Sequence, residues 1–215
     1  MKSEDYFVDA FVAALVDAAD HGNSLGVAAA VSAGASPNAQ GREGITPLLF
    51  VLASRRDKNG LRLLLKAGAN PNMITAGGMC PMLVAVRAED SEFLSIMLDG
   101  GGNPNLKNTS AEPVIQVAAR DARWENLNKL IDSGADINAV NSSGFNTLMG
   151  LVALRRYENI AWLIGKGADV QMRTPNGTTL AQMVKEGTVR ADSPAAPWRE
   201  KVIRLLRERG VGLPE

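Results

Sequence analysis

The sequence is poor in the side chains that most often carry chemistry. Its 215 residues include one cysteine, Cys80, and one histidine, His21. A single cysteine cannot form an internal disulfide, and one histidine with one cysteine is too few for Cys/His zinc coordination. Nucleophilic catalysis would need His21 beside Cys80 or a serine, yet these residues lie in different parts of the chain. We therefore expect no catalytic, metal or cofactor site.

An excess of one charge and a long apolar run are also missing. The 23 Lys and Arg residues balance the 23 Asp and Glu residues, so the chain lacks the net positive charge with which proteins attract nucleic acid. Its longest apolar stretch, residues 7–19, is interrupted by Asp9 and Asp17 and predicts an amphipathic helix, neither a signal sequence nor a bilayer span. We expect no nucleic-acid partner and no transmembrane segment.

Aromatic residues are scarce, whereas aliphatic residues are plentiful. Phe, Trp and Tyr make up 5% of the chain, although 46% of its residues are hydrophobic. Aliphatic side chains must therefore fill the core, which favours helices packed on helices. The length allows one or two domains.

A short turn of small residues recurs along the chain. Its five copies are 33–38, 67–72, 100–105, 133–138 and 166–171, and their glycines are spaced by 34, 33, 33 and 33 residues. Each copy follows an aliphatic helical pattern, and its glycine suits the positive φ that ends a helix. Helix starts follow about ten residues later, at 44–49, 78–83 and 144–149. Each repeat is thus predicted as helix, turn, helix and hairpin.

These residues resemble the ankyrin repeat, with its Gly-x-Thr-Pro-Leu-His start, a second helix ending in Leu-Leu, and then Gly-Ala-Asp-x-Asn. The resemblance covers nearly the whole chain and implies an all-α repeat solenoid, with paired antiparallel helices and projecting hairpin loops. We expect a single domain of about six repeats: an N-terminal cap at 1–43, central repeats at 44–77, 78–110, 111–143 and 144–176, and a C-terminal cap at 177–215 with an insertion at 188–197.

The chain departs from the ankyrin pattern at the histidine of its helix start. That position holds Leu49, Leu83, Gln116 and Met149. The resemblance implies that histidine braces neighbouring repeats by hydrogen bonds. We therefore expect packing to replace this polar bracing.

The resemblance implies a non-catalytic protein-protein interaction module, monomeric when unbound, that binds one partner protein on a concave face of first helices and hairpins. A narrower likeness lies at 3–7 and 202–206, which look like bacterial ankyrin proteins with a cleaved lipoprotein leader. Some of those are immunity proteins against secreted phospholipase effectors, so a lipase or other toxin would be the partner and the periplasm the location. Without a leader the location would be cytoplasmic. The alternatives are an intracellular adaptor, a host-directed effector or an enzyme's regulatory domain.

Two groups of residues are candidates for partner contacts. The apolar Met73 and Ile74 are predicted at a hairpin tip, where nothing in the fold requires apolar residues, although they could also fold back onto the hairpin. Arginines near the ends of first helices are predicted to form a stripe that meets an acidic surface, unless they only complement helix C-termini. The complete set is Arg42, Met73, Ile74, Lys107 and Arg173 on hairpins, and Arg55, Arg87, Arg120 and Arg155 near first helices.

Four further residues have structural interpretations. His21 should close the first helix, because a polar or positive side chain suits free carbonyl groups there. Cys80 is either a reactive thiolate at a helix N-terminus or a small buried side chain, and the second is favoured. Trp124 and Tyr157 stand 33 residues apart and are predicted to pack together in the core, with an exposed pair that anchors a partner as the alternative.

Overall fold

A computed structural model describes residues 2–214, which form helices joined by turns and hairpin loops. In the last hairpin loop an isolated antiparallel bridge pairs Arg173 with Thr179. The chain divides into two compact units, one ending at Asn108 and the other beginning at Thr109. The expectation of an all-α repeat solenoid is confirmed for the described chain.

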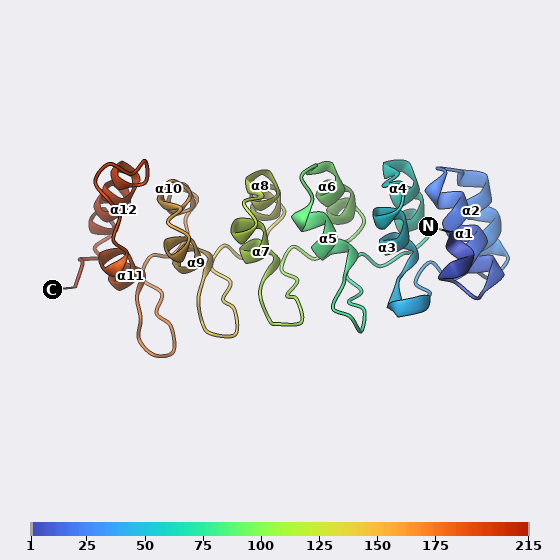
Figure 1. Cartoon of the computed structure of the whole chain (residues 1–215), viewed down its shortest axis with the longest axis horizontal. Coiled ribbons are helices and arrows are strands. Elements are labelled where there is room, and N and C mark those ends of the chain that lie inside the picture. The colour runs from blue at the N-terminus through green and yellow to red at the C-terminus, as the bar shows by residue number, and fades with distance from the viewer. Residues whose placement is uncertain (1, 215) are drawn as a thin grey trace. The chain divides into compact units, whose positions relative to one another are not determined.

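The first unit contains three helix pairs in two layers (Figure 1). The pairs are α1 (Ala10–Asp20) with α2 (Ser24–Ser32), α3 (Pro47–Ala53) with α4 (Lys58–Lys66), and α5 (Pro81–Arg87) with α6 (Glu92–Asp99), and the 3-10 turns are η1 (Ser3–Asp5) and η2 (Arg42–Gly44). First helices pack on first helices, α1 on α3 and α3 on α5, while α2, α4 and α6 form the second layer.

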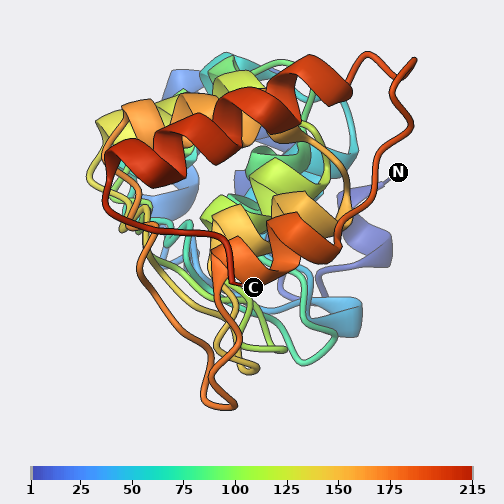
Figure 2. The ribbon, with the colours of Figure 1, turned by 90° about the vertical axis from the view of Figure 1, so that its left-hand side faces the viewer.

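The second unit repeats this arrangement. Its pairs are α7 (Val114–Arg120) with α8 (Trp124–Asp132), α9 (Thr147–Ala153) with α10 (Tyr157–Gly165), and α11 (Leu180–Glu186) with α12 (Ala196–Glu208). Helix α9 packs on α7 and α11, and α10 packs on α12. Figure 2 shows the last pair as two layers, with the hairpin loops on the side of α11. One helix pair thus falls within each of the six predicted repeats, whose bounds remain predictions.

Several helices begin at a residue whose side chain satisfies a free backbone amide. Asn146 caps α9, because its Oδ1 accepts a hydrogen bond from the backbone N–H of Met149 at 3.0 Å. Thr179 and Gln182 form a reciprocal capping box at the start of α11. At the other end of a pair, Gly68 has a φ of 93°, as the turn pattern predicted. Few L-residues adopt this conformation without strain, which explains the recurring glycine.

The core is aliphatic, as the composition predicted. Every residue of α3 from Pro47 to Leu52 is buried, and Leu61 and Leu64 of α4 are fully enclosed. The aromatic pairs cluster instead at the start of the chain, where Tyr6 and Phe7 pack edge-on against Phe50 at centroid distances of 5.6 and 6.0 Å. Burial of such side chains contributes about 1.5–3 kcal/mol each.

Asparagine side chains join the hairpin of one repeat to the turn of the next. Asn72 donates from Nδ2 to the carbonyl of Gly101 at 2.9 Å, and its Oδ1 accepts from the backbone N–H of Asn103 at 2.7 Å. Asn38 makes the same pair of bonds with the next turn, to the Gly68 carbonyl at 2.8 Å and from the Asn70 N–H at 2.6 Å. In the second unit Asn138 accepts from the N–H of Asp169 at 2.8 Å. We call Asn38, Asn72 and Asn138 the asparagine ladder.

The expectation that packing alone replaces the missing histidines is therefore wrong in part. Besides the ladder, Gln116 keeps polar bracing, because its Nε2 donates to the carbonyls of Ala139 at 2.9 Å and Phe145 at 2.8 Å. Leu49 and Met149 are buried in the apolar core instead. Polar bracing between repeats in this chain comes from the asparagine ladder and from Gln116.

The extra residues of the last repeat are shared between a loop and a helix. The loop between α11 and α12 covers 187–195, whereas the matching loop between α9 and α10 covers 154–156. Helix α12 has 13 residues, four more than α10. Ala196 and Pro197, which the sequence assigned to the insertion at 188–197, lie in the first turn of α12.

The turn inside several helix pairs uses a left-handed residue other than glycine. Gly22 occupies this turn between α1 and α2, with a φ of 64°. The corresponding turns place Arg56, Ala122 and Arg155 at φ values of 58°, 56° and 55°. An L-residue in this region is strained by roughly 1–2 kcal/mol.

Candidate functional site

The first helices and the hairpin loops of each unit form one face, here called the first-helix face. Hairpins close through a short backbone hydrogen bond, such as that from the N–H of Thr75 to the carbonyl of Met79 at 2.8 Å and that from the N–H of Asn141 to the carbonyl of Phe145 at 3.0 Å. Because the ladder also anchors the base of hairpins, this face is held in shape without a partner. Such preorganisation lowers the entropy lost on binding.

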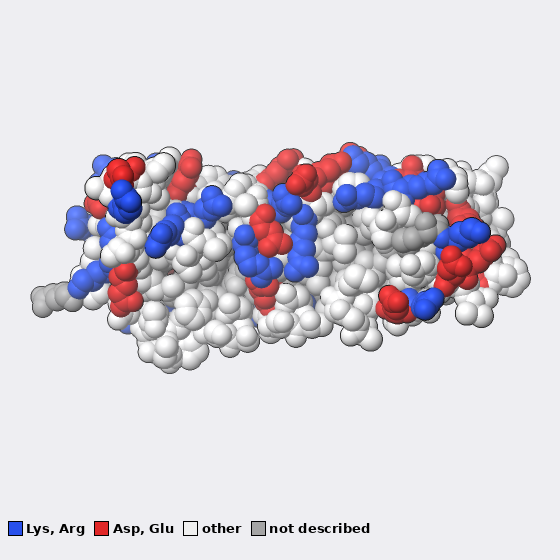
Figure 3. Space-filling view, viewed as in Figure 1, with Lys and Arg blue, Asp and Glu red and all other residues white. Residues whose placement is uncertain are grey.

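The hairpin tips carry mostly small or neutral residues. Figure 3 shows little charge on these tips apart from the first hairpin, whose tip contains Arg42 and Glu43. Both residues are exposed. The tips at 76–78 and 142–144 consist of Ala, Gly and Ser. Shape and backbone groups, rather than charge, are therefore what most tips offer a partner.

Met73 and Ile74 are not at a hairpin tip. Both are half-buried on the arm of the hairpin that precedes the turn, and the turn itself is formed by Ala76 and Gly77. The thioether of Met73 also faces the neighbouring hairpin, where the Nε2 of Gln40 lies 3.7 Å from its Sδ. Their partial burial agrees with the alternative that these residues fold back onto the hairpin.

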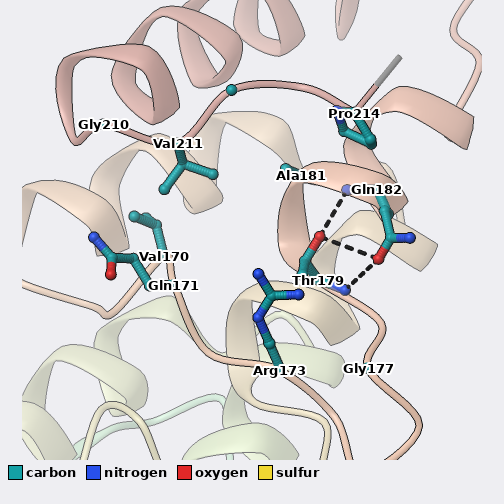
Figure 4. A pocket seen from close by; sticks show the side chains of 11 residues that line it. Val170, Gln171, Arg173, Gly177, Thr179, Ala181, Gln182, Gly210, Val211 and Pro214 are labelled. Carbon is teal, nitrogen blue, oxygen red and sulfur yellow. Dashed lines mark hydrogen bonds between the residues drawn. The ribbon is translucent and has the colours of Figure 1, made fainter.

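The other hairpin candidates are exposed. Lys107 is exposed on the arm of its hairpin that precedes the turn, one repeat after Ile74. Arg173 is exposed beside its bridge partner Thr179. Figure 4 shows the Arg173 side chain among the residues lining a pocket of about 490 Å³ between the last hairpin, α11 and the segment 210–214.

The arginines near first helices do not share one position of the repeat. Arg87 and Arg120 are the last residues of α5 and α7, whereas Arg155 follows α9 in the left-handed turn. Arg55 also follows its helix, and its Nε lies 3.6 Å from the carboxylate of Asp20. Helix α9 ends in Ala153 at the position that corresponds to Arg120, which interrupts the register of the predicted stripe.

Arg120 is held by two carboxylates. It pairs with Glu112 from the preceding hairpin, and its Nε donates to Asp121 at 3.1 Å. The hydrogen bond to Glu112 is the main reason why the pKa of Arg120 is raised above its ordinary value. This pairing fixes the guanidinium at the edge of the first-helix face.

A second pocket lies on the first-helix face of the second unit, with a volume of about 220 Å³. It opens between α7, α9 and the hairpin that joins their repeats, and Arg120, Gly150 and Leu154 are among its lining residues. Sequence reasoning missed it, because the spaces between helices depend on packing. The signal that could have indicated it is Gly150 in the middle of a helix.

His21 and Cys80 occupy structural positions. The ring Nδ1 of His21 lies 2.8 Å from the carbonyl of Asp17 at the end of α1, as expected. Cys80 is fully buried, and its Sγ donates to the carbonyl of Pro71 at 3.2 Å. Burial raises the pKa of the Cys80 thiol, which suppresses the thiolate. The small buried side chain is thus the interpretation that the structure supports.

The predicted pair of Trp124 and Tyr157 has two different environments. Tyr157 is 1% exposed, and its hydroxyl donates to the carbonyl of Gly187 at 3.2 Å. Trp124 is only half-buried at the start of α8. Tyr157 thus anchors the long loop before α12, a role that its repeat position alone did not indicate.

Residues 2–214 contain no cluster of three or more His, Cys, Asp or Glu side chains that could hold a metal ion. None of the helices described over this range is long and apolar enough to cross a bilayer.

Comparison with known proteins finds similarity in structure. No protein-family model matches the chain. No curated protein matches its sequence. The solved ankyrin repeat protein EF0377 is similar with a TM-score of 0.69 and 22% identity, over 92% of this chain and 98% of that one.

Two further solved structures are similar over the same share of the chain. The ankyrin repeat domain of Bcl-3, described as a unique member of the IkappaB protein family, has a TM-score of 0.75 and 22% identity, covering 92% of this chain and 86% of that one. An ankyrin repeat domain from Acinetobacter baumannii AYE has a TM-score of 0.72 and 21% identity, covering 92% and 97%. With its paired helices and recurring glycine turns, the chain therefore has the ankyrin-repeat fold.

Proposed function

We propose that the chain is a non-catalytic protein-binding module, monomeric when unbound, that holds one partner protein on its first-helix face. The observation that carries this proposal is the preorganised hairpin array. Asn38 and Asn72 each tie one hairpin to the next turn by two hydrogen bonds, so the loops already hold their shape in the free protein. A rigid face loses little conformational entropy when it binds.

The side chains on this face suit a protein partner. Arg42, Lys107 and Arg173 are exposed on hairpins and can pair with acidic groups. Met73 and Ile74 retain partial exposure and can add apolar contact. The burial of Cys80 and the capping contact of His21 support a role without catalysis.

Two narrower versions of this function differ in the partner. In the first, the chain is a bacterial immunity protein that blocks a secreted toxin such as a phospholipase effector, in the periplasm. Its support is the likeness of 3–7 and 202–206 to bacterial ankyrin lipoproteins. In the second, the chain is an intracellular adaptor or a host-directed effector, which the general fold supports equally well.

Affinity capture tests the proposal. The chain is used as bait in a bacterial lysate and in the secreted fraction, at low and then raised salt, and stoichiometric partners are identified by mass spectrometry. A secreted lipase or another toxin favours the immunity role, whereas a cytosolic or host protein favours the adaptor. Absence of any stoichiometric partner would count against a binding module.

Matched variants then locate the contact. Lys107→Ala and Arg173→Ala change the hairpins, and Arg204→Ala changes an exposed arginine of α12 in the second helix layer. We expect the hairpin variants to weaken the captured complex by roughly tenfold or more, as for contacts at the centre of an interface, and Arg204→Ala to leave it unchanged. The reverse pattern would place the interface on the second helix layer and refute the proposed face.

A further inference from the structure

The pocket of about 220 Å³ in the second unit has features that its surroundings do not explain. Its lining residues come from α7, from α9 and from the hairpins on either side of α7. The residues that matter for what it can bind are Glu112, Arg120, Thr147, Gly150 and Leu154.

Gly150 leaves space in the lining of this pocket. It lies inside α9, it is exposed, and no heavy atom lies within 4 Å of a Cβ placed on it. Glycine in a helix interior is less stable than alanine, because it loses more backbone freedom on folding. No close neighbour requires glycine here, so folding does not account for it. Its missing side chain does keep the pocket open.

Thr147 supplies an unused polar group in the wall. This side chain is 2% exposed, and its Oγ1 has no hydrogen-bond partner. A buried hydroxyl without a partner is unfavourable, and native proteins rarely keep one. The oxygen is covered in the free protein, so a ligand hydroxyl supplies the missing bond once the Thr147 side chain turns toward the pocket.

The pocket is lined by an exposed apolar side chain, Leu154, and by an arginine, Arg120, whose charge is already neutralised. Leu154 is 46% exposed, an uncommon position for a leucine that nothing covers. Arg120 is already paired with Glu112 and Asp121. A charged ligand would compete with this cluster, whereas an uncharged one leaves it intact.

We propose that this pocket binds the phenol side chain of a tyrosine presented by the partner protein. The ring lies over Gly150 and against Leu154, and the phenol hydroxyl bonds to the hydroxyl of Thr147. An apolar cavity of about 150 Å³ accommodates benzene, so this volume suffices for a phenol ring. Tyrosine joins a large apolar area to one polar tip and is enriched at the centres of interfaces. This inference rests on the proposed binding function.

The probe for the test is p-cresol, the side chain of tyrosine as a free molecule. The full chain, labelled with ¹⁵N, is titrated with p-cresol while backbone amide shifts are recorded. We expect saturable shifts at Thr147, Gly150 and Leu151, and toluene should bind about fivefold more weakly because it lacks one hydrogen bond. In Thr147→Val this preference should disappear. Shifts that do not saturate there, or equal affinity for toluene and p-cresol, overturn the proposal.

Two glycine variants separate pocket filling from a general effect. Gly150→Leu fills the pocket and should abolish the p-cresol shifts. Gly165→Leu is the matched control, because Gly165 lies in α10 and a Cβ placed there also meets nothing within 4 Å. Retained p-cresol binding in Gly150→Leu, or loss in both variants with folding intact by circular dichroism, refutes the assigned site.

The same variants distinguish this inference from the broader function. If a captured partner binds Gly150→Leu as tightly as the unchanged chain, the tyrosine site is refuted while the binding function stands. If p-cresol binds as described but capture finds no stoichiometric partner, the pocket assignment stands and the proposed function fails. We expect Gly150→Leu to weaken the partner at least tenfold and Gly165→Leu to leave it unchanged.

Discussion

Replacing Asn72 by alanine should weaken the attachment between two neighbouring repeats by a predictable amount. The change removes the bond to the Gly101 carbonyl at 2.9 Å and the bond from the Asn103 N–H at 2.7 Å. Each such bond contributes about 0.5–1.5 kcal/mol net, and the exposed setting favours the lower half because water can replace the lost partner. The expected loss for Asn72→Ala is about 1–2 kcal/mol in the free energy of unfolding.

Urea unfolding followed by circular dichroism measures this loss as a lower midpoint with an unchanged slope. Hydrogen exchange at the Asn103 amide should accelerate at the same time. Asn128→Ala is the control, because its side chain bonds only to Asp132 on the same helix at 2.9 Å and alanine favours helix. A loss below about 0.3 kcal/mol for Asn72→Ala, or an equal loss for Asn128→Ala, would refute the bracing role.

Three further predictions follow from other parts of the structure. Gly60→Ala should destabilise the chain by more than about 2 kcal/mol, since its Cβ would collide with a backbone oxygen of α1. Gly150→Ala should instead stabilise the chain by about 1 kcal/mol, because alanine favours the helix and its Cβ meets no neighbour. Thermal unfolding of both variants measures these changes. Cys80 should resist Ellman's reagent at pH 8 in the folded chain, because burial raises its thiol pKa, and react once urea unfolds the chain; rapid reaction without urea would contradict its burial. Hydrogen bonding from Lys58 lowers the pKa of Glu92 below its ordinary 4.5, so the stabilising contribution is present above that value and is lost as the pH falls through the lower folded pKa. Lys58→Met should therefore make the fall in Tm on acidification shallower, and an unchanged profile would show that this pair contributes nothing.

The sequence predicted the parts of the fold that local chemistry controls. Glycines such as Gly68 and Gly134 have positive φ at helix ends, and Pro47 and Pro81 begin helices. These residues have few permitted conformations, so their positions are informative without tertiary contacts. The fixed spacing of the turns then predicted the stacking of like helices.

Features that depend on side-chain packing could not be predicted in the same way. The recurrence of Asn38, Asn72 and Asn138 was visible, but the sequence does not tell whether an asparagine caps its own turn or reaches the next one. The positions of Met73 and Ile74 on the hairpin arm, and not at its tip, depended on where the turn closes. The pocket over Gly150 arises from three separate segments, which no local pattern joins.

The left-handed turns inside the helix pairs leave the native state locally frustrated. At Gly22 the chain uses the residue that this conformation suits, yet it keeps Ala122 and Arg155 in the corresponding turns. Alanine and arginine there oppose the fold locally, while the surrounding helices impose the turn on them. Such positions are sites where a substitution can add stability to the fold. A single change to glycine can raise stability without touching the core, and the stability gained can tolerate a later, destabilising change on the binding face.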